Sequence, residues 1–341
     1  MLYDATLLTS PWFLRDGSNT VVSRNERSIL NIIWMNKNIQ RTEVAELSIL
    51  SQQSIHRIIE NLFERGIIKY GDPRPGTGRG KPSPTLTLDG SFAYSAGISL
   101  NTDIADICLM DCAGNIIATA NLALHSRPLS EVIGELVNAV SLLQARHRLS
   151  AKKFFGVGFA IAGYRTGGTK FNAPVPLREW SLIELGPVLS DAFGQPVWVE
   201  NGANTAALAE NMFGAGRTTN TFAYLSFNYG FGGGVIYEGN LLPGGFGNAG
   251  EFSSMFDQDE VKRRPALQLL VEHLEGHGIM IPSLSYLRDH FDPAWPGVQD
   301  WVCITTPAYN RLINALIAVI DPKIIVFGGE VPRKLATMLI Q

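Results

Sequence analysis

Polar side chains between residues 51 and 57 are of the types that form hydrogen bonds to base edges in the major groove of DNA. A loop rich in glycine, proline and basic residues follows at residues 72–84, and its thin backbone can carry cations to a phosphate or into the minor groove. The residues expected to contact bases are Gln52, Gln53, His56 and Arg57. The residues expected to contact phosphates or the minor groove are Thr42, Ser51, Ser54, Arg79 and Lys81.

Hydrophobic spacing predicts the elements that carry these side chains. Apolar residues recur at helical spacing after Asn25, which can cap a first helix, and Thr42 can cap a short second one. Ser51 can cap a third helix, which Gly66 ends. Residues 67–70 and 85–88 have the composition of strands on either side of the basic loop. This order predicts a winged helix-turn-helix over residues 21–90, preceded by an arm of residues 1–20.

The distribution of charge also favours a polyanion at the N-terminal part of the chain. Residues 1–90 carry 11 Lys/Arg against 9 Asp/Glu, whereas the rest of the chain carries 17 against 22. Within residues 66–82 there are four basic residues and a single acid, Asp72. Double-stranded operator DNA is the expected partner. The alternative is a small helical domain whose polar face is simply solvated.

From Ala93 onward the sequence alternates between apolar strands and amphipathic helices, with glycines at strand ends. This pattern is typical of α/β folds that bind a small ligand between two lobes. The lobes are expected at residues 91–200 and 201–341. Strands are predicted at 96–100, 105–110, 116–122, 154–161, 197–199, 221–227, 233–237 and 324–327, and helices at 130–149, 204–212 and 312–320.

Composition indicates a folded protein without a metal centre. Apolar residues make up 45% of the 341 residues and charged residues 17%. Cys108, Cys112 and Cys303 lack the spacing of zinc ligands or of a disulfide framework. His273 and His277 lie four residues apart, but no second pair of ligands accompanies them. No apolar run is long enough to span a membrane, so a cytoplasmic location is expected.

Several motifs in the second part of the chain resemble the ROK family of repressors and sugar kinases. Residues 199–210, Val-Glu-Asn-Gly-Ala-Asn-Thr-Ala-Ala-Leu-Ala-Glu, are similar to the signature V-E-N-D-A-N-x-A-A-x-A-E. Residues 156–163, 230–234, 249–251 and 324–329 resemble a family strand and turn, a glycine-rich turn, an A-G-E motif and a closing strand. The winged segment is similar to the repressor branch, which includes xylose and N-acetylglucosamine repressors. The resemblance implies a sugar-kinase-like domain of the actin/hexokinase-like, ribonuclease H-like fold.

Departures from the family pattern argue against an enzyme. Family kinases use the aspartate after the signature asparagine as general base, and here Gly202 stands at that position. The phosphate motif D-x-G-x-T corresponds to residues 99–103, where Ser99 replaces the aspartate; a shifted register would bring Asp103 into play. The cysteines of the family zinc site are missing. Neither ATP nor zinc is therefore expected as a cofactor, and no residue is assigned a catalytic or metal-binding role.

The resemblance retains part of a sugar site. Asn201 and Glu251 match two family positions that hold the sugar, whereas Ser254 and Val175 replace the other two. We therefore expect a transcriptional regulator of carbohydrate-related genes, acting as a homodimer or tetramer, with a sugar or sugar phosphate as effector. Two alternatives remain open, namely a sugar kinase with a degenerate site and a regulator that binds another protein and no ligand.

Overall fold

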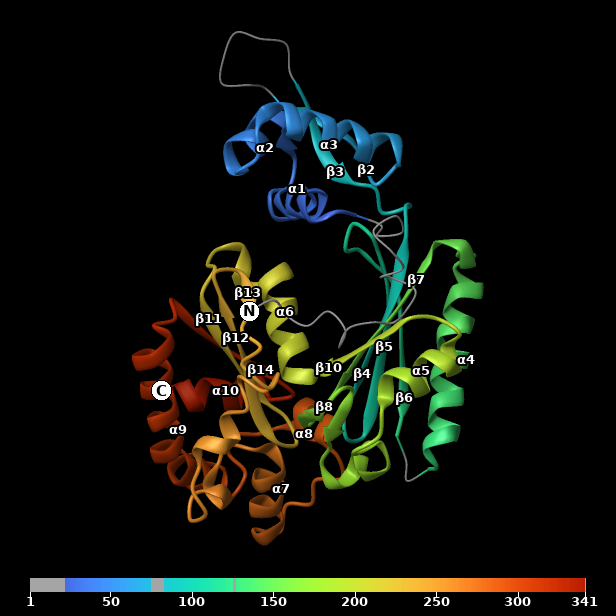
Figure 1. The fold of residues 1–341 in the computed structure, drawn as a ribbon. Helices are drawn as coiled ribbons and strands as arrows, with labels where there is room; N and C mark the ends of the chain where they lie inside the picture. Colours follow the sequence, from blue (N-terminus) through green and yellow to red (C-terminus); the bar gives the residue numbers. More distant parts are fainter. Residues whose placement is uncertain (1–21, 75–82, 125–126, 341) are drawn as a thin grey trace.

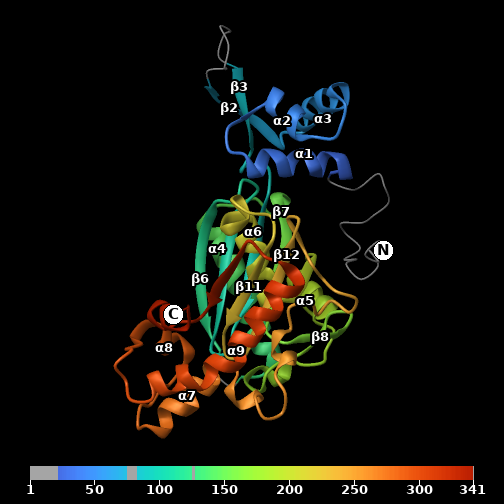
Figure 2. The same ribbon diagram turned by 90° about the vertical axis from the view of Figure 1, so that its left-hand side faces the viewer.

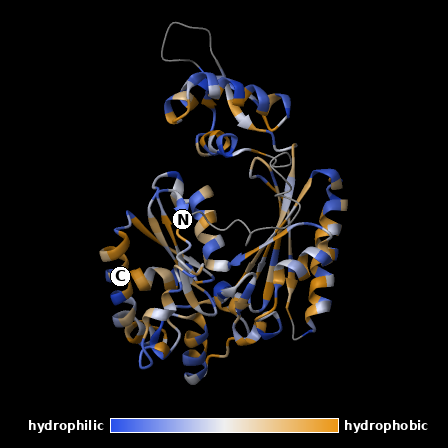
Figure 3. Cartoon of the chain, viewed as in Figure 1, coloured by the Kyte–Doolittle hydropathy of each residue, from blue (hydrophilic) through white to orange (hydrophobic). Residues whose placement is uncertain are grey.

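The computed structural model describes residues 22–74, 83–124 and 127–340. Its elements form a small N-terminal unit at one end of two larger α/β lobes, as both views show (Figures 1 and 2). Figure 3 shows that the helices of the N-terminal unit alternate between hydrophilic and hydrophobic residues, as amphipathic helices do. Within the described residues each part has its own cluster of buried apolar side chains.

The N-terminal unit consists of helices packed on a small sheet. Its elements are α1 (Arg24–Met35), β1 (Ile39–Gln40), α2 (Arg41–Leu47), α3 (Gln52–Glu64), β2 (Ile68–Arg74) and β3 (Ser83–Leu88). The strands pair antiparallel in the order β1-β3-β2. Its core brings together Ile29, Ile33, Ile55, Ile59 and Leu62 from α1 and α3. The helices and strands predicted in this region are present, and β1 was not predicted.

Two predicted helix caps in this unit are wrong. Ser23, and not Asn25, caps α1. Its hydroxyl accepts from the Glu26 backbone N–H, and the Glu26 carboxylate accepts from the Ser23 backbone N–H. Gln40, and not Thr42, is the cap residue of α2. Thr42 is the second residue of that helix and is exposed. The predicted cap of α3 is confirmed, since the Ser51 hydroxyl accepts from the backbone N–H of Ser54 at 3.3 Å.

The first lobe is built on a mixed sheet in the order β10-β7-β4-β5-β6. Strands β4, β7 and β10 are parallel, whereas β4, β5 and β6 form an antiparallel meander. Alternate residues of β4, Ala96, Ile98 and Leu100, are buried against the helices α4 and α5, which leaves Ser99 on the face toward the second lobe. The elements are β4 (Tyr94–Leu100), β5 (Ile104–Asp111), β6 (Ile116–Ala123), α4 (Leu129–Arg146), β7 (Phe154–Ile161), β8 (Tyr164–Gly167), β9 (Lys170–Asn172), α5 (Leu185–Phe193) and β10 (Val197–Asn201).

The second lobe has a sheet in the order β13-β12-β11-β14, covered on both faces. In the central strand β11, Phe222 and Tyr224 face the helix α6, whereas Ala223, Leu225 and Phe227 face the layer that contains α9. The elements are α6 (Gly202–Phe213), β11 (Phe222–Phe227), β12 (Phe231–Tyr237), β13 (Asn240–Leu241), α7 (Leu267–Gly276), α8 (Leu284–His290), α9 (Val298–Ile320), β14 (Ile324–Gly329) and α10 (Arg333–Ile340). Short 3-10 helices lie at Ala151–Lys153, Val175–Trp180, Ala215–Arg217, Phe252–Met255 and Val261–Arg263.

The glycine-rich segment of this lobe is divided between a turn and a strand, and the strand begins two residues earlier than the predicted 233–237. Gly230 lies in the turn, but Gly232, Gly233 and Gly234 belong to β12. A Cβ on Gly234 would lie 2.7 Å from that of Ala207, so the glycine allows α6 to pack directly on the sheet. Close packing therefore explains Gly233 and Gly234, whereas a Cβ on Gly230 would meet nothing within 4 Å.

Helix α9 is longer than the predicted segment 312–320. Among the described residues it is the one helix that is long and apolar enough to cross a membrane by length and composition. One side of it, including Trp301, Leu312 and Leu316, is buried in the core of the second lobe. The helix also carries exposed apolar residues, Ile304, Ile317 and Val319.

Candidate functional site

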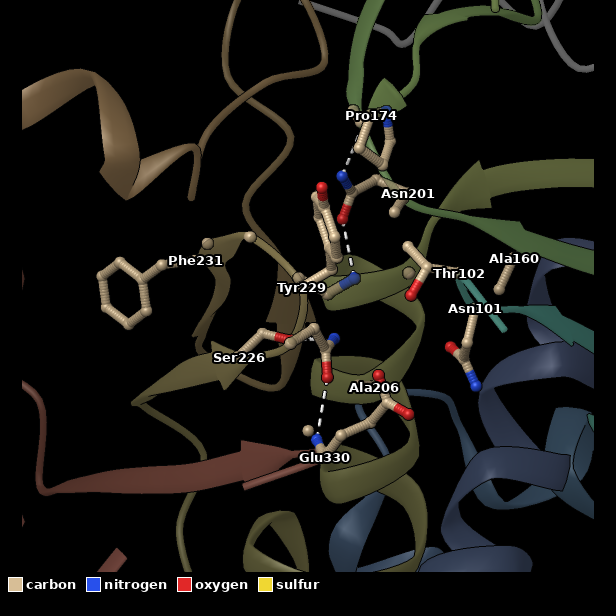
Figure 4. Close-up of a pocket in the computed structure, with 18 of the residues that line it drawn as sticks. Asn101, Thr102, Ala160, Pro174, Asn201, Ala206, Ser226, Tyr229, Phe231 and Glu330 are labelled. Atoms are coloured by element: carbon tan, nitrogen blue, oxygen red, sulfur yellow. Dashed lines mark hydrogen bonds between the residues drawn. The ribbon is translucent and has the colours of Figure 1, made fainter. Parts of the chain in front are cut away.

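A cavity of about 630 Å³ lies between the two lobes. Its walls come from the β4–β5 turn, the segments after β7 and β9, the first turn of α6, the β11–β12 turn and the end of β14. Figure 4 shows Asn101 and Thr102 on one wall, and Ser226 and Glu330 on the other. The cavity therefore lies where the predicted fold places a ligand, between the carboxyl ends of strands from both sheets.

Asn201 forms hydrogen bonds to several segments at one end of this cavity. Its side-chain oxygen caps α6 by accepting from the backbone N–H groups of Ala203 at 2.7 Å and Asn204 at 3.1 Å. Its amide nitrogen donates to the carbonyl of Gly163 at 2.7 Å and to Glu251 at 3.0 Å. The side chain thus makes four hydrogen bonds within the protein, and it links the start of α6 to both lobes.

Glu251 is the partner of Asn201, so the structure brings together the two residues predicted to hold a sugar. Burial raises the pKa of the Glu251 carboxyl. Since Asn201 Nδ2 donates to Oε1, the second carboxylate oxygen of Glu251 is the one that remains to accept from a ligand hydroxyl. The predicted replacements lie elsewhere: Val175 is 77% exposed and Ser254 is exposed. Asn172, which the sequence did not single out, lines the cavity instead.

Gly202 is the first residue of α6 and lines the cavity. A Cβ placed on it would find its nearest neighbour at 3.7 Å, the backbone oxygen of Ile161, which is ordinary van der Waals contact. Neither packing nor backbone conformation therefore requires glycine at this position. The fold has room for a carboxylate here, and the sequence does not supply one.

Two acids in and beside the β4–β5 turn accept hydrogen bonds from other residues of the protein. Asp106 lines the cavity and accepts from Asn101 at 3.1 Å and Asn121 at 2.7 Å. Asp103 accepts from both the backbone N–H and the hydroxyl of Ser285, at 3.2 and 2.6 Å, and so ties this turn to the start of α8. Asp103 is directed toward α8, which argues against the shifted register.

The end of β14 contributes a buried acid that the sequence analysis missed. Glu330 is only 8% exposed, and its backbone N–H donates to the side-chain oxygen of Asn228 at 2.8 Å. Burial, together with the negative charges of Asp103 and Asp106, raises the pKa of Glu330 to about 7, although Arg288 opposes the shift. The only sequence signal for this residue is its place directly after Gly328 and Gly329.

No group of three or more potential metal ligands occurs among residues 22–74, 83–124 and 127–340. The rings of His273 and His277 lie 4.7 Å apart, and His277 Nδ1 is 2.8 Å from the carbonyl oxygen of His273. This contact within the end of one helix gives the pair a structural explanation.

The polar face of α3 is directed to solvent. Gln52, Gln53, His56 and Arg57 are all exposed, and they lie opposite the buried residues of the same helix. Arg41 of α2, which the sequence analysis did not select, approaches His56 Nδ1 to 2.8 Å and forms an ion pair with Glu60 at 2.7 Å. The Ser51 and Ser54 hydroxyls lie 2.9 Å apart at the start of α3. The remaining predicted contacts, Arg79 and Lys81, lie outside the described residues.

The N-terminal unit contacts both lobes through Trp34, near the end of α1. Its ring meets Phe213, the last residue of α6, edge-on at a centroid distance of 5.4 Å. It also lies against Gly114 in the β5–β6 turn. Arg217, just beyond α6, donates to the carbonyl of Met35 at 3.5 Å. Helix α6 therefore begins at the cavity and ends against the N-terminal unit (Figure 1).

Comparison with known proteins finds a family match over part of the region that forms the cavity. Residues 95–260 match the ROK family model, so the chain contains a ROK family domain. An uncharacterized protein of Sinorhizobium fredii is 25% identical over 324 residues, which is 94% of this chain and 81% of that protein. The xylose repressor of Bacillus spizizenii is 27% identical over 232 residues, or 68% of this chain. The regulator NagC of Escherichia coli is 25% identical over 230 residues, or 67% of this chain. The aligned stretch spans 60% of the xylose repressor and 56% of NagC.

Solved structures show the same fold. A ROK family transcriptional regulator described as a homologue of the E. coli MLC protein has a TM-score of 0.69 at 19% identity, and covers 93% of this chain and 85% of its own. A ROK family glucokinase from Streptomyces griseus, solved with glucose and AMPPNP, has a TM-score of 0.56 at 20% identity. It covers 70% of this chain and 83% of its own. The fold is therefore shared with both a regulator and a kinase, and the residues must decide between these functions.

Proposed function

We propose that this chain is a sequence-specific DNA-binding regulator of carbohydrate-related genes, whose ROK domain senses a ligand and does not transfer phosphate. The observation that carries the proposal is the combination of an exposed Gln/His/Arg face on α3 with a ROK domain that has glycine at the position of the base. The relatives named as repressors support this assignment. Its place of action would be the cytoplasm, where a bacterial operator is found.

In this proposal residues 21–90 form a winged helix-turn-helix. Helix α3 enters the major groove of operator DNA, where Gln52, Gln53 and Arg57 contact base edges. Because Arg41 already approaches His56, we assign His56 to a supporting contact as well as to base recognition. The loop between β2 and β3 would be the wing, and Arg79 and Lys81 would reach phosphates or the minor groove from it.

Two features of the cavity support the loss of phosphoryl transfer. At position 202 there is no group to accept the proton of a sugar hydroxyl, since glycine has no side chain. At the other end, Glu330 and Asp106 place carboxylates near the turn that would otherwise approach phosphates, and like charges there disfavour a triphosphate.

Helix α6 supplies a route from ligand to DNA. A ligand hydroxyl bound to Glu251 would act on the hydrogen-bond partner of Asn201, the residue that caps the start of this helix. Its end at Phe213 packs on Trp34 of the N-terminal unit. In a homodimer or tetramer, a shift of α6 would change the spacing of the two α3 helices and hence the affinity for a palindromic operator.

Selection of operator DNA from a random pool by the purified full chain tests the proposal. A sequence should be enriched at moderate salt, and Arg57→Ala should weaken its binding by about tenfold or more, as expected for loss of a bidentate base contact. Arg27→Ala, which removes the same charge from an exposed position on α1, is the control and should preserve the sequence preference. Absence of enrichment, or unchanged binding by Arg57→Ala, would refute the proposal.

Phosphoryl transfer is tested by a coupled ATP assay over a panel of hexoses. We expect background rates for the wild-type chain. Turnover above background with any hexose would overturn the non-enzymatic assignment and favour the degenerate kinase.

The second candidate is a regulator that binds another protein and no ligand. It is favoured by one observation, the complete satisfaction of Asn201 within the protein. Thermal unfolding in the presence of sugars separates the two candidates, since stabilisation by a sugar supports a sensor. Operator binding without stabilisation by any sugar would favour the second candidate.

A further inference from the structure

The cavity continues well past the pair Asn201 and Glu251. In Figure 4, Asn201 lies at one end of the drawn site and Glu330 at the other, with Tyr229 and Ser226 between them. Its volume of about 630 Å³ falls within the range of roughly 300–1,000 Å³ of pockets that hold ligands larger than a single hexose. A monosaccharide bound at Asn201 and Glu251 would not reach the other end of the cavity, at Glu330, which is called the inner end below.

Glu330 provides an unused hydrogen-bond acceptor at this inner end. Its Oε1 atom is buried without a hydrogen-bond partner, and its carboxylate forms no hydrogen bond or ion pair with any described residue. An unsatisfied buried acceptor is costly, and a ligand donor would remove that cost. Figure 4 shows the side chain extending from the end of β14 into the space toward Asn101.

Ser226 provides a matching donor. It is 3% exposed, and its oxygen accepts from the side-chain amide of Asn228 at 3.0 Å. The proton of its hydroxyl has no acceptor among the described residues, so it remains available to a ligand. An acceptor and a donor that line the same cavity fit a sugar hydroxyl, which can both donate and accept.

A phosphate does not fit this end of the cavity. Glu330 and Asp106 are both acids, and the pair Asn101 and Asn121 already occupies the oxygens of Asp106. The guanidinium groups that line the cavity have partners within the protein: Arg264 donates to the carbonyl of Val261 at 2.9 Å, and Arg288 donates to Asp289 at 3.0 Å. Charge here favours a neutral or positively charged group.

We propose that Glu330 and Ser226 form a second subsite, which binds a hydroxyl or amino group of an uncharged or amine-bearing carbohydrate that extends beyond one hexose. The proposal rests on the proposed sensor function and names its ligand class. The effector is a disaccharide or an amino sugar glycoside, bound with one unit at Asn201 and Glu251 and the next at Glu330. The carboxylates of Glu330 and Asp106 disfavour a phosphate group at this end of the cavity.

Calorimetric titration and thermal unfolding of the full chain test this assignment. The probes are glucose, glucose 6-phosphate, cellobiose and chitobiose, together with glucosamine and the β-disaccharide of glucosamine. A disaccharide should bind more tightly than glucose or glucose 6-phosphate. Glu330→Gln, which keeps the shape of the side chain, should lower the affinity for that disaccharide by about tenfold or more. The affinity for the monosaccharide should be unchanged.

Two further variants locate the effect. Ser226→Ala removes the hydroxyl donor and should also lower the affinity for the same disaccharide. It provides a second test in case Glu330→Gln does not fold. Glu275→Gln, at an exposed position on α7, is the control and should bind like the wild type. Tightest binding by glucose 6-phosphate, undiminished disaccharide binding by both subsite variants, or absence of stabilisation by every probe would overturn the subsite.

The outcome is independent of DNA binding. Operator binding with no probe bound would reject the subsite and leave the DNA-binding function standing. Disaccharide binding through Glu330 without any operator preference would do the reverse.

Discussion

Replacing Glu330 by glutamine should stabilise the chain at pH 8 and have little effect at pH 4.5 or below. Burial, with the nearby Asp103 and Asp106, raises the pKa of Glu330 to about 7, and Arg288 is the charged group that opposes this shift. The folded chain therefore holds the proton of this carboxyl more tightly than the unfolded chain does. Glutamine has nearly the same shape and is uncharged at every pH.

The magnitude follows from the difference between the ordinary pKa of 4.5 and the value of about 7. At roughly 1.4 kcal/mol for each pKa unit, ionising Glu330 in the folded state costs about 3 kcal/mol. Below pH 4.5 the carboxyl is protonated in both the folded and the unfolded chain, so this cost is absent. As the pH rises from 4.5 to 7 the wild-type chain loses this stability progressively, and above pH 7 the loss is complete. The Glu330→Gln variant does not lose this stability, because glutamine does not ionise.

Urea unfolding at pH 4.5, 6 and 8 measures the effect. The free energy of unfolding of Glu330→Gln should exceed that of the wild type by up to about 3 kcal/mol at pH 8, and the difference should shrink as the pH falls. Tryptophan fluorescence can follow the unfolding, because Trp301 is buried in the second lobe, which also contains Glu330. Glu275→Gln should show no such trend. A difference that is independent of pH, or a variant that is less stable at pH 8, would refute this reasoning.

Three other variants test the remaining structural arguments. Ser51→Ala removes the cap of α3 and should lower the free energy of unfolding of the N-terminal unit by about 1 kcal/mol in urea; no change would deny the cap a role. Phe213→Ala should leave sugar-induced thermal stabilisation intact but reduce the effect of that sugar on operator affinity, as measured by fluorescence anisotropy; full retention of the effect would exclude this contact as the link. Gly114→Ala should destabilise the chain by about 1–3 kcal/mol in thermal unfolding, because φ is +80° and the new Cβ would lie 1.9 Å from the ring of Trp34. Gly245→Ala, with nothing within 4 Å, is its control, and equal effects of the two would contradict the contact.

The N-terminal unit could be predicted closely because its helices are amphipathic and locally determined. The spacing of Ile55, Ile59 and Leu62 fixes the buried side of α3 without any information from the rest of the chain. Helix starts were less certain, because several polar residues near each start can act as caps. Ser23 was preferred over Asn25 by its bond to Glu26 three residues later, a pattern that the sequence does contain.

The Asn201 end of the cavity was predictable from motif resemblance, whereas the Glu330 end was not. Asn201 and Glu251 stand in motifs, and the structure joins them directly. The backbone N–H of Glu330 donates to Asn228, which lies 102 residues earlier in the chain, and Asp103 and Asp106 of the other lobe raise the pKa of its carboxyl. Contacts of this kind arise from the packing of the two lobes, and no local sequence pattern predicts them. The short helices α7, α8 and α10 were missed for a related reason, since their stability depends on burial in the core of the second lobe.

In the proposed function, helix α6 would allow a ROK domain without the base to keep a regulatory role. Its first residue, Gly202, has space for a side chain that could accept a proton, and removing that group leaves the helix start intact because Asn201 caps it. The bonds from Asn201 reach Gly163 in one lobe and Glu251 in the other, so a change in the angle between the lobes must act on this end of the helix. Its other end packs on Trp34. In the proposed function, catalysis would need a side chain at the start of α6, whereas coupling would need only the position of the helix, which Asn201 fixes without the base.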